Sequence, residues 1–382
     1  MELPKSKRLN VAMLSANRDA YSETFIVAQR EHLPHNIFFY YHGLPPRKIA
    51  NSAAMRPTFF QRMLAKVTRS NNSLHTTNLK RSFRNNHIDV VLAQFGPMGV
   101  AIAQICADLD LPLIVHFHGA DAYVKDYISP IERYKSMFDI ADAIIVVSDD
   151  MKRQLLHLGA PETKLYLTCY GPRQEFFKIN APRNHKRFLS VGRFVDKKAP
   201  YYTILAFSRI IADHGEARLT MVGDGPLLNT CKNLVKYLKL ETNVDFKGVL
   251  SHDDVCEIMQ ESLCFVQHSI TADNGDKEGS PVAIIEAAAA GLPIVATKHA
   301  GINFTVVHNQ TGYLVDEGDV EGMSQYMNRI CSDFSVAIAF GDAGRRHIFQ
   351  NASMDKYIYD IHTVILKAYD AKESKGKNNI NQ

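Results

Sequence analysis

Two carboxylates stand eight positions apart in the second half of this chain, at Glu278 and Glu286. On a helix, that spacing directs both side chains toward one crevice, one above the other. Because a carboxylate accepts hydrogen bonds through both oxygens, the pair matches vicinal hydroxyls of a ribose or a sugar ring. A structural alternative is a first-turn anion followed by a surface helical residue. Glu286, however, lies between Ile285 and four alanines, where an unpartnered carboxylate is costly, and this favours a binding role.

The residues between the two carboxylates predict a helix that opens near Ser280 and continues through the alanines at 287–290. The first N–H groups of a helix have no carbonyl partner inside it and therefore attract anions. We expect the segment Gly279, Ser280 and Pro281 to bind phosphate or sugar oxygens, through the amides of its first two residues.

A single loop, Gly192 to Lys198, offers two cations after an apolar run at 188–191. Arg193 can hold a diphosphate through two N–H groups, whereas Lys198 acts as a point charge. Gly192 permits close approach of the backbone. A solvated basic loop is the alternative for this segment taken alone.

A glycine-rich turn at 223–226, with Gly223 and Gly225, follows the apolar run at 219–222 and precedes a helical stretch. A strand, a turn and a helix in that order can aim backbone N–H groups at an anion. A plain strand-to-helix turn has the same composition. The turn is therefore a candidate anion site with an equally good structural alternative.

The loop after the apolar run at 113–116 carries His118, Gly119 and Asp121. Strand alternation places His116 and His118 on one side, so a metal site completed by Asp121 is one alternative. No further His or Cys cluster in the sequence supplies a convincing third ligand. We therefore expect no metal ion. We expect His118 to point across a cleft between two domains, as a hydrogen-bond partner of a bound sugar.

Short apolar runs alternate with helical stretches along both halves of the chain, a pattern typical of parallel strands joined by helical crossovers. The fold class is therefore α/β, with two Rossmann-like, doubly wound domains that face a cleft. We place the domains at 1–174 and 175–353, followed by a helix at about 354–372 that packs back on the first domain and a frayed tail from Lys372. The expected strands are 9–14, 37–41, 88–93, 113–116, 143–147, 188–191, 219–222, 244–246, 263–267, 294–296 and 313–315.

Composition favours a globular enzyme and excludes other classes. A chain of 382 residues, 46% hydrophobic and 22% charged, is too long for one core and resembles neither a disordered nor an integral membrane protein. The six cysteines show no paired spacing and are expected to be reduced, and a net charge of +4 indicates no nucleic-acid partner. The apolar stretch from Val90 to Ala107 is expected to form a strand, a loop and a helix. An early apolar run ends too soon for a signal peptide, so we expect a cytoplasmic protein.

Taken together, these segments resemble the retaining glycosyltransferases of the GT4 type, or group 1, which have the two-domain architecture called GT-B. The family includes bacterial exopolysaccharide and lipopolysaccharide sugar transferases. Its most specific marker is an E-x7-E motif, here Glu278 to Glu286. The run Ser-Glu-Thr-Phe-Ile at 22–26 is similar to the branch that contains colanic acid transferases. Further similar segments are Gly192-Arg193 with Lys198, the turn at 223–226, the stretch 248–252 and His118-Gly119-x-Asp121.

The resemblance implies a nucleotide-diphosphate sugar as the donor and a glycan or lipid-linked saccharide as the acceptor. The acceptor hydroxyl would attack on the face from which the diphosphate departs, so no cofactor, metal ion or enzyme nucleophile is required. His118, Arg193, Lys198 and Glu278 would form the catalytic set. The implied contacts are Arg193 and Lys198 with the diphosphate, Glu286 with the ribose, Glu278 with the sugar, and Val249 and Leu250 with the base.

Three departures from the family pattern concern the donor. The first loop reads Ser-Ala-Asn-Arg-Asp at 15–19, whereas many relatives have glycines there. Asn303 and Phe304 replace a Pro-Glu pair, which removes a carboxylate, and His268 replaces a proline. These departures indicate an unusual donor or a reduced activity.

Two other functions remain as alternatives. A nucleotide-sugar epimerase of similar architecture would need acid and base carboxylates in the cleft, and the first half offers no convincing pair. A non-catalytic scaffold for another transferase would keep the fold without charges in a cleft. The presence of Arg193, Lys198, Glu278 and Glu286 together argues against it.

A basic amphipathic segment lies at 56–69. Its apolar residues recur at helical spacing and are flanked by four cations, a pattern typical of helices that lie in an anionic membrane surface. The alternative is a surface helix whose apolar stripe packs on the first domain. The membrane interpretation would place the protein on the inner face of the plasma membrane. The apolar residues are Phe59, Phe60, Met63, Leu64 and Val67, and the cations are Arg56, Arg62, Lys66 and Arg69.

Overall fold

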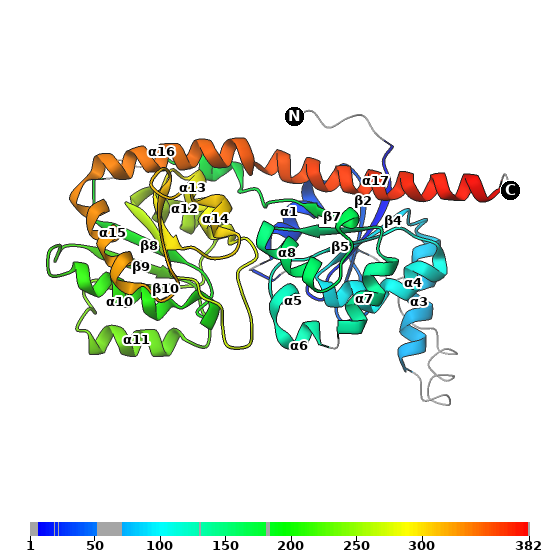
Figure 1. The fold of residues 1–382 in the computed structure, drawn as a ribbon, viewed down its shortest axis with the longest axis horizontal. Coiled ribbons are helices and arrows are strands. Elements are labelled where there is room, and N and C mark those ends of the chain that lie inside the picture. Colours follow the sequence, from blue (N-terminus) through cyan, green and yellow to red (C-terminus); the bar gives the residue numbers. More distant parts are fainter. Residues whose placement is uncertain are drawn as a thin grey trace. The chain divides into compact units, whose positions relative to one another are not determined.

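The structure is a computed structural model that describes residues 7–380 except 19, 22, 52–70, 130 and 181–183. The described residues form two compact units (Figure 1). The first unit ends at Thr168 and resumes at Tyr357, and the second extends from Cys169 to Lys356. The candidate membrane segment 56–69 lies outside the described residues.

The first unit is built on a seven-stranded sheet with the order β3-β2-β1-β4-β5-β6-β7. Its strand pairs are parallel, apart from the antiparallel pair of β2 and β3. The central strands are almost entirely buried, as expected when helices cover both faces of a parallel sheet. The strands are β1 (Asn10–Leu14), β2 (Asn36–Tyr41), β3 (Lys48–Ile49), β4 (Val90–Gln94), β5 (Leu113–His116), β6 (Ala143–Val146) and β7 (Leu165–Leu167).

The second unit contains a six-stranded parallel sheet with the order β10-β9-β8-β11-β12-β13. Counted from its own first strand, this is the doubly wound order 3-2-1-4-5-6. The strands are β8 (Arg187–Val191), β9 (Arg218–Val222), β10 (Val244–Gly248), β11 (Cys264–Gln267), β12 (Ile294–Thr297) and β13 (Gly312–Val315).

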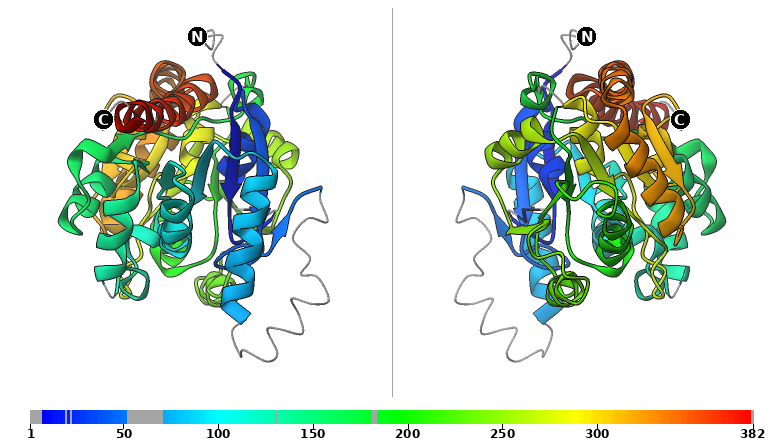
Figure 2. Two further views of the ribbon diagram at one scale, coloured as in Figure 1. Left: turned by 90° about the vertical axis from the view of Figure 1, so that its right-hand side faces the viewer. Right: turned by 90° about the vertical axis from the view of Figure 1, so that its left-hand side faces the viewer.

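Helices flank the strands of both sheets (Figure 2). Helix α4 packs on α7 in the first unit, and in the second α10 packs on α15 and α13 on α16. Helix α17 belongs to the first unit from Tyr357 onward. The first unit contains α1 (Thr24–His32), α3 (Asn71–Asn85), α4 (Gly96–Leu109), α5 (Ala120–Tyr123), α6 (Lys125–Ile128), α7 (Ile131–Ile140), α8 (Asp149–His157) and α17 (Met354–Ile380). The second contains α9 (Gln174–Phe177), α10 (Pro200–Ile210), α11 (Leu228–Tyr237), α12 (His252–Glu261), α13 (Val282–Ala289), α14 (Ile302–Thr305), α15 (Val320–Ser332) and α16 (Phe334–Asn351).

The α/β prediction is confirmed, and every expected strand is present within two residues of its predicted bounds. The edge strands β3 and β7 were not predicted. The frayed tail from Lys372 is wrong, because α17 continues to Ile380. A helix that is already nucleated extends through polar residues without needing to bury them. Within the described ranges, no helix has the length and apolarity needed to cross a membrane.

The loops after β8 and β9 cross each other so closely that their backbone atoms are in contact. Gly223 has a φ of +131°, and a Cβ at that position would lie 2.0 Å from the carbonyl oxygen of Gly192. The amide of Gly192 donates to Val222 O at 2.9 Å, and that of Phe194 donates to Asp224 O at 3.0 Å. The glycine therefore allows the turn at 223–226 to hold the loop that carries Arg193 and Lys198.

We expect Gly223→Ala to destabilise the second unit by about 3 kcal/mol or more, because a methyl group there must displace backbone atoms. Gly318→Ala is the matched control. Gly318 also has a positive φ, +81°, but a Cβ there would meet nothing within 4 Å, so only backbone strain of about 1–2 kcal/mol applies. Urea unfolding of the two variants measures the difference. Equal losses would contradict the crossing.

Candidate functional site

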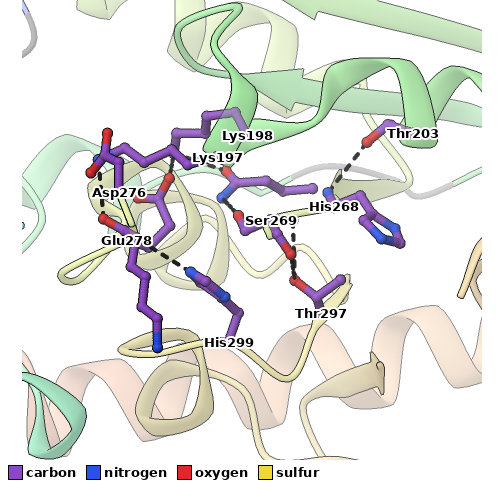
Figure 3. Close-up of polar contacts among 11 residues, drawn as sticks. Lys197, Lys198, Thr203, His268, Ser269, Asp276, Glu278, Thr297 and His299 are labelled. Carbon is purple, nitrogen blue, oxygen red and sulfur yellow. Dashed lines mark hydrogen bonds and ion pairs between the residues drawn. The ribbon is translucent and has the colours of Figure 1, made fainter. Parts of the chain in front are cut away.

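In open α/β sheets, ligands bind beyond the carboxyl ends of the strands where the strand order reverses. In the second unit this point lies between β8 and β11. The segment after β8 carries Lys198, and the segment after β11 carries Glu278. The two side chains meet, with Lys198 Nζ 3.2 Å from Glu278 Oε1 (Figure 3). The structure thus brings together two of the residues that the sequence analysis selected.

Both members of this ion pair are largely buried. Burial lowers the pKa of Lys198, and Glu278 partly offsets that effect. Burial raises the pKa of Glu278, but the positive charges of Lys198 and Lys197 outweigh burial and leave that pKa below its ordinary value. Glu278 is therefore an ionised acceptor. Its buried Oε1 faces Lys198 Nζ, which is its ion-pair partner.

Lys197, which the sequence analysis passed over, turns away from Lys198. It is buried, and its Nζ donates to Asp276 Oδ1 at 2.9 Å and to the carbonyl of Lys277 at 3.1 Å. Both lysines lie in one short 3-10 turn, Asp196–Lys198, that leads into α10. Lys197 fixes the loop that ends at Glu278, while Lys198 faces the carboxylate itself. The sequence alone does not separate the roles of the two lysines. They differ in their partners, which are Asp276 for Lys197 and Glu278 for Lys198.

A layer of hydrogen bonds beneath the ion pair orients Gln267. Gln267 Nε2 donates to Ser269 Oγ at 2.8 Å, so the amide oxygen faces Lys198 Nζ, 3.3 Å away. The amide of Ser269 donates to Thr297 Oγ1 at 3.0 Å, and that hydroxyl donates to Ser269 O at 2.7 Å (Figure 3). These bonds hold the segment after β11 against the end of β12.

His268, which the sequence analysis gave as a departure from the family pattern, has hydrogen-bond partners in the structure. Its Nε2 accepts the amide of Gly318 at 2.8 Å, and its own amide donates to Thr203 Oγ1 at 3.3 Å. Burial lowers the pKa of His268 to about 4, so the ring is neutral at ordinary pH. His268 therefore links the loop after β13, through Gly318, to the candidate site.

Helix α13 begins at Val282 with Pro281 as its N-cap, which corrects the expected start at Ser280. The amides of Ile284 and Ile285 both donate to Pro281 O, so the first turn closes there. Gly279 and Ser280 precede the helix, and their amides are loop amides.

Glu286 lies on the buried face of α13. Burial raises the pKa of Glu286 to about 8, although the charge of Arg173 opposes the rise. The side chain is therefore largely protonated at neutral pH, and a hydroxyl-rich ligand would supply the hydrogen bonds that its ionised form needs.

The remaining predicted residues of the second unit differ in exposure. Arg193 is exposed, and its side chain forms no hydrogen bond or ion pair with the residues that the structure describes. The amide of Gly223 donates to Gly248 O at 2.7 Å, and the amide of Gly225 donates to Asp224 Oδ1, also at 2.7 Å. These bonds support a structural role for the turn. Val249 is half-exposed beside Leu250.

In the first unit, His118 is buried and stacks on Phe25 with ring centroids 4.3 Å apart. His118 Nε2 lies 2.8 Å from Gln94 Oε1, and Gln94 Nε2 donates to Gln29 Oε1 at 2.7 Å. Burial and the neighbouring His116 lower the pKa of His118 well below its ordinary value. His118 is therefore a neutral hydrogen-bonding group held by a buried amide chain.

Asp121 is committed to the backbone. Its carboxylate accepts the amides of Gly96 at 2.9 Å, His118 at 3.1 Å and Gly119 at 2.8 Å. These bonds shape the loop around His118. Across the described ranges, no three or more His, Cys, Asp or Glu side chains gather into a group that could hold a metal ion.

Two family models match adjoining parts of the chain. Residues 33–171 match Glycosyltransferase Family 4, and residues 172–347 match Glycosyl transferases group 1. The chain belongs to this glycosyltransferase family. The second match contains the complete Lys198–Glu278 site, and the first contains His118.

Curated relatives of this glycosyltransferase include two bacterial proteins. WcaL of Salmonella typhimurium, assigned provisionally to colanic acid biosynthesis, is 30% identical over 62% of this chain and 60% of its own length. The amylovoran biosynthesis glycosyltransferase AmsK of Erwinia amylovora is 30% identical over 63% of this chain and 61% of its own. The matches thus span about three fifths of these relatives.

Solved structures show that the glycosyltransferase has the GT-B fold. HepE of Anabaena, solved with UDP and glucose, aligns with a TM-score of 0.72 and 14% identity over 93% of this chain and 98% of its own. Sucrose-phosphate synthase of Thermosynechococcus elongatus aligns with a TM-score of 0.74 and 18% identity over 95% of this chain and all of its own. At these identities the likeness concerns the fold alone.

The raised pKa of Glu286 predicts a pH-dependent stability. Below pH 4.5 the group is protonated in the folded and unfolded states, so burying it carries no ionisation penalty. Between pH 4.5 and about 8 the unfolded chain releases this proton while the buried carboxyl keeps it, so stability falls across that window and levels off above it. Glu286→Gln removes that loss. We expect the variant to be more stable than wild type at pH 9, by on the order of a few kcal/mol, and to differ from it by less than about 1 kcal/mol at pH 5.

Thermal unfolding between pH 5 and 9 measures this difference. The control is Glu257→Gln, which changes an exposed glutamate of α12. Parallel curves for wild type and Glu286→Gln would show that Glu286 is not a desolvated acid.

Proposed function

We propose that this glycosyltransferase moves a sugar from a nucleoside diphosphate sugar to a glycan or lipid-linked acceptor, with retention of anomeric configuration and without a metal ion. The ion pair of Lys198 and Glu278 carries the proposal. It joins a cation suited to phosphate to an ionised carboxylate suited to hydroxyls, at the carboxyl ends of the strands where the sheet order reverses.

On donor binding, Lys198 and Glu278 each exchange the other for a group of the donor. In the free protein, Lys198 is neutralised by Glu278. A diphosphate takes over part of the lysine charge, and Arg193, exposed on the same loop, grips it bidentately. The buried Oε1 of Glu278 then accepts sugar hydroxyls, with Gly279 and Ser280 supplying loop amides beside it.

The nucleoside would extend away from this pair. Glu286 binds the ribose hydroxyls, and its burial makes the ligand a better partner than water. Val249 and Leu250 offer an apolar surface to the base. Pro281 and the turn at Gly223 and Gly225 shape the phosphate end of the site, the turn by holding the Arg193 loop in place.

The chemical step transfers the anomeric carbon from the diphosphate oxygen to the acceptor oxygen. The acceptor hydroxyl attacks on the face from which the diphosphate leaves, and a departing phosphate oxygen takes its proton. Lys198 and Arg193 stabilise the charge that develops on the leaving group, which is the role a metal ion would otherwise fill. In the first unit, His118 is a neutral hydrogen-bonding group of the kind that suits a sugar hydroxyl.

The relatives named for colanic acid and amylovoran biosynthesis support an acceptor in exopolysaccharide synthesis. A lipid-linked acceptor would place the reaction on the cytoplasmic face of the plasma membrane, where the segment 56–69 is the candidate contact. The sugar and the base are best identified by screening purified protein against UDP-, GDP-, ADP- and dTDP-sugars for donor hydrolysis and thermal stabilisation.

We expect Lys198→Ala to lower kcat by about 100- to 1000-fold, because the leaving diphosphate loses its buried cation. Lys298→Ala is the control, since Lys298 forms an exposed ion pair with Asp316. Steady-state kinetics with the best donor from the screen provide the measurement. Near-wild-type turnover in a folded Lys198→Ala protein would remove Lys198 from the site.

The stereochemistry and the metal requirement test the chemistry itself. Proton NMR of fresh product should show the anomeric configuration of the donor, because attack and departure share one face. EDTA should leave the rate unchanged, because Lys198 and Arg193 supply the positive charge. An inverted product, or activity lost with EDTA and restored by Mg²⁺ or Mn²⁺, would refute the mechanism.

A further inference from the structure

His299 and Glu317 lie beside the site without belonging to any motif of the sequence. His299 follows β12, Glu317 follows β13, and the two meet with Nδ1 of the imidazole 2.6 Å from Oε1 of the carboxylate. The side chain of His299 is 1% exposed and that of Glu317 is 37% exposed. The other nitrogen of the ring, Nε2, lies 3.2 Å from the backbone nitrogen of Glu278 (Figure 3).

These two contacts define the tautomer of His299. A backbone N–H can only donate, so Nε2 must carry a lone pair to accept the bond from Glu278. The proton of the neutral ring is therefore on Nδ1, where it donates to Glu317. The carboxylate of Glu317 stabilises this tautomer, and in this tautomer Nε2 of His299 accepts the hydrogen bond that fixes the backbone of Glu278.

Glu317 also holds the opposite end of the same loop. Its Oε2 accepts the backbone amide of Thr271 at 2.8 Å. One carboxylate thus fixes the loop at Thr271 directly and at Glu278 through His299. Lys197 holds the middle of the loop through Asp276.

We propose that His299 and Glu317 are positioning residues for recognition of the donor sugar. They act through the backbone of Glu278, so that its carboxylate faces the sugar hydroxyls while Lys198 faces the diphosphate. The inference rests on the proposed role of Glu278 in sugar binding. It predicts a specific division of effects, because loss of the pair weakens recognition of the sugar and leaves recognition of the nucleoside diphosphate intact.

Four variants test this division. His299→Leu removes both hydrogen bonds at similar volume, and Glu317→Ala removes the carboxylate. His299→Gln is the rescue variant, since its side-chain amide can accept from Glu278 and donate to Glu317. Asp316→Ala is the matched control, because Asp316 is the neighbouring carboxylate but pairs with exposed Lys298.

Two measurements separate an effect on the position of Glu278 from a general loss of structure at the site. Calorimetry gives the Kd of the nucleoside diphosphate, chosen from UDP, GDP, ADP and dTDP by its binding to wild type. Steady-state kinetics give KM and kcat for the corresponding nucleotide sugar. For His299→Leu and Glu317→Ala we expect kcat/KM for the donor to fall about tenfold or more, with the Kd of the diphosphate changed by less than about twofold. His299→Gln and Asp316→Ala should stay within about threefold of wild type in both.

The tautomer is measured without any substrate. A long-range ¹H–¹⁵N spectrum, with His299 assigned by its absence in His299→Gln, should show the proton on Nδ1 in wild type. A proton on Nε2 would overturn the inference. Unchanged donor kinetics in folded His299→Leu and Glu317→Ala would also overturn it, as would a parallel loss of diphosphate and donor binding. A wild-type protein that uses no nucleotide sugar would refute the proposed function instead, and the spectrum would still test the hydrogen bonds.

Discussion

Burying Lys198 against Glu278 is the constraint on which the rest of the candidate site depends. Two charges removed from water are tolerated only when each has partners, because desolvation otherwise exceeds their mutual attraction. Lys198 has Gln267 as its second partner, and Lys197 adds positive charge near Glu278. Each partner is itself held, Gln267 by Ser269 and Lys197 by Asp276. The loops after β8, β11, β12 and β13 are thereby organised around one pair.

A buried ion pair contributes little to stability. Its use is that each member can exchange its partner for a charged or polar group of a ligand. Replacing a buried ion pair by apolar residues often leaves stability unchanged or raises it. Here the pair keeps a cation and a carboxylate facing each other and largely out of water. This arrangement suits a ligand that carries both phosphate and hydroxyl groups. Glu286 follows the same logic, since its raised pKa marks a carboxyl whose burial weakens the fold at alkaline pH. Both features are local costs of the kind that folds retain at functional sites.

The sequence predicts the strands and the charged centre, but not the groups that orient it. Parallel strands buried on both faces are continuous apolar runs, so they were found, whereas the short edge strands β3 and β7 lack that signal. Glu278 and Lys198 were found because each follows a strand and carries charge. Lys197, His299 and Glu317 were missed because their roles depend on partners distant in the sequence, such as Asp276 for Lys197. Gly223 stayed ambiguous for the same reason, since its need for φ > 0 comes from the crossing with Gly192.

The first six strands of the first unit follow the same order, 3-2-1-4-5-6, as the six strands of the second, but the two units differ in the charge of the groups at their strand ends. In the second unit, the segments after β8 and β11 present ionised groups, which suits a diphosphate and its sugar. In the first unit, the buried groups at the end of β4 and after β5 are uncharged or committed to the backbone. Gln94 is an amide, His118 is neutral, and the carboxylate of Asp121 accepts three backbone amides. Neutral groups of this kind discriminate hydroxyls by geometry rather than by charge. Similar strand orders therefore support ionised groups at the strand ends of one unit and uncharged groups in the other.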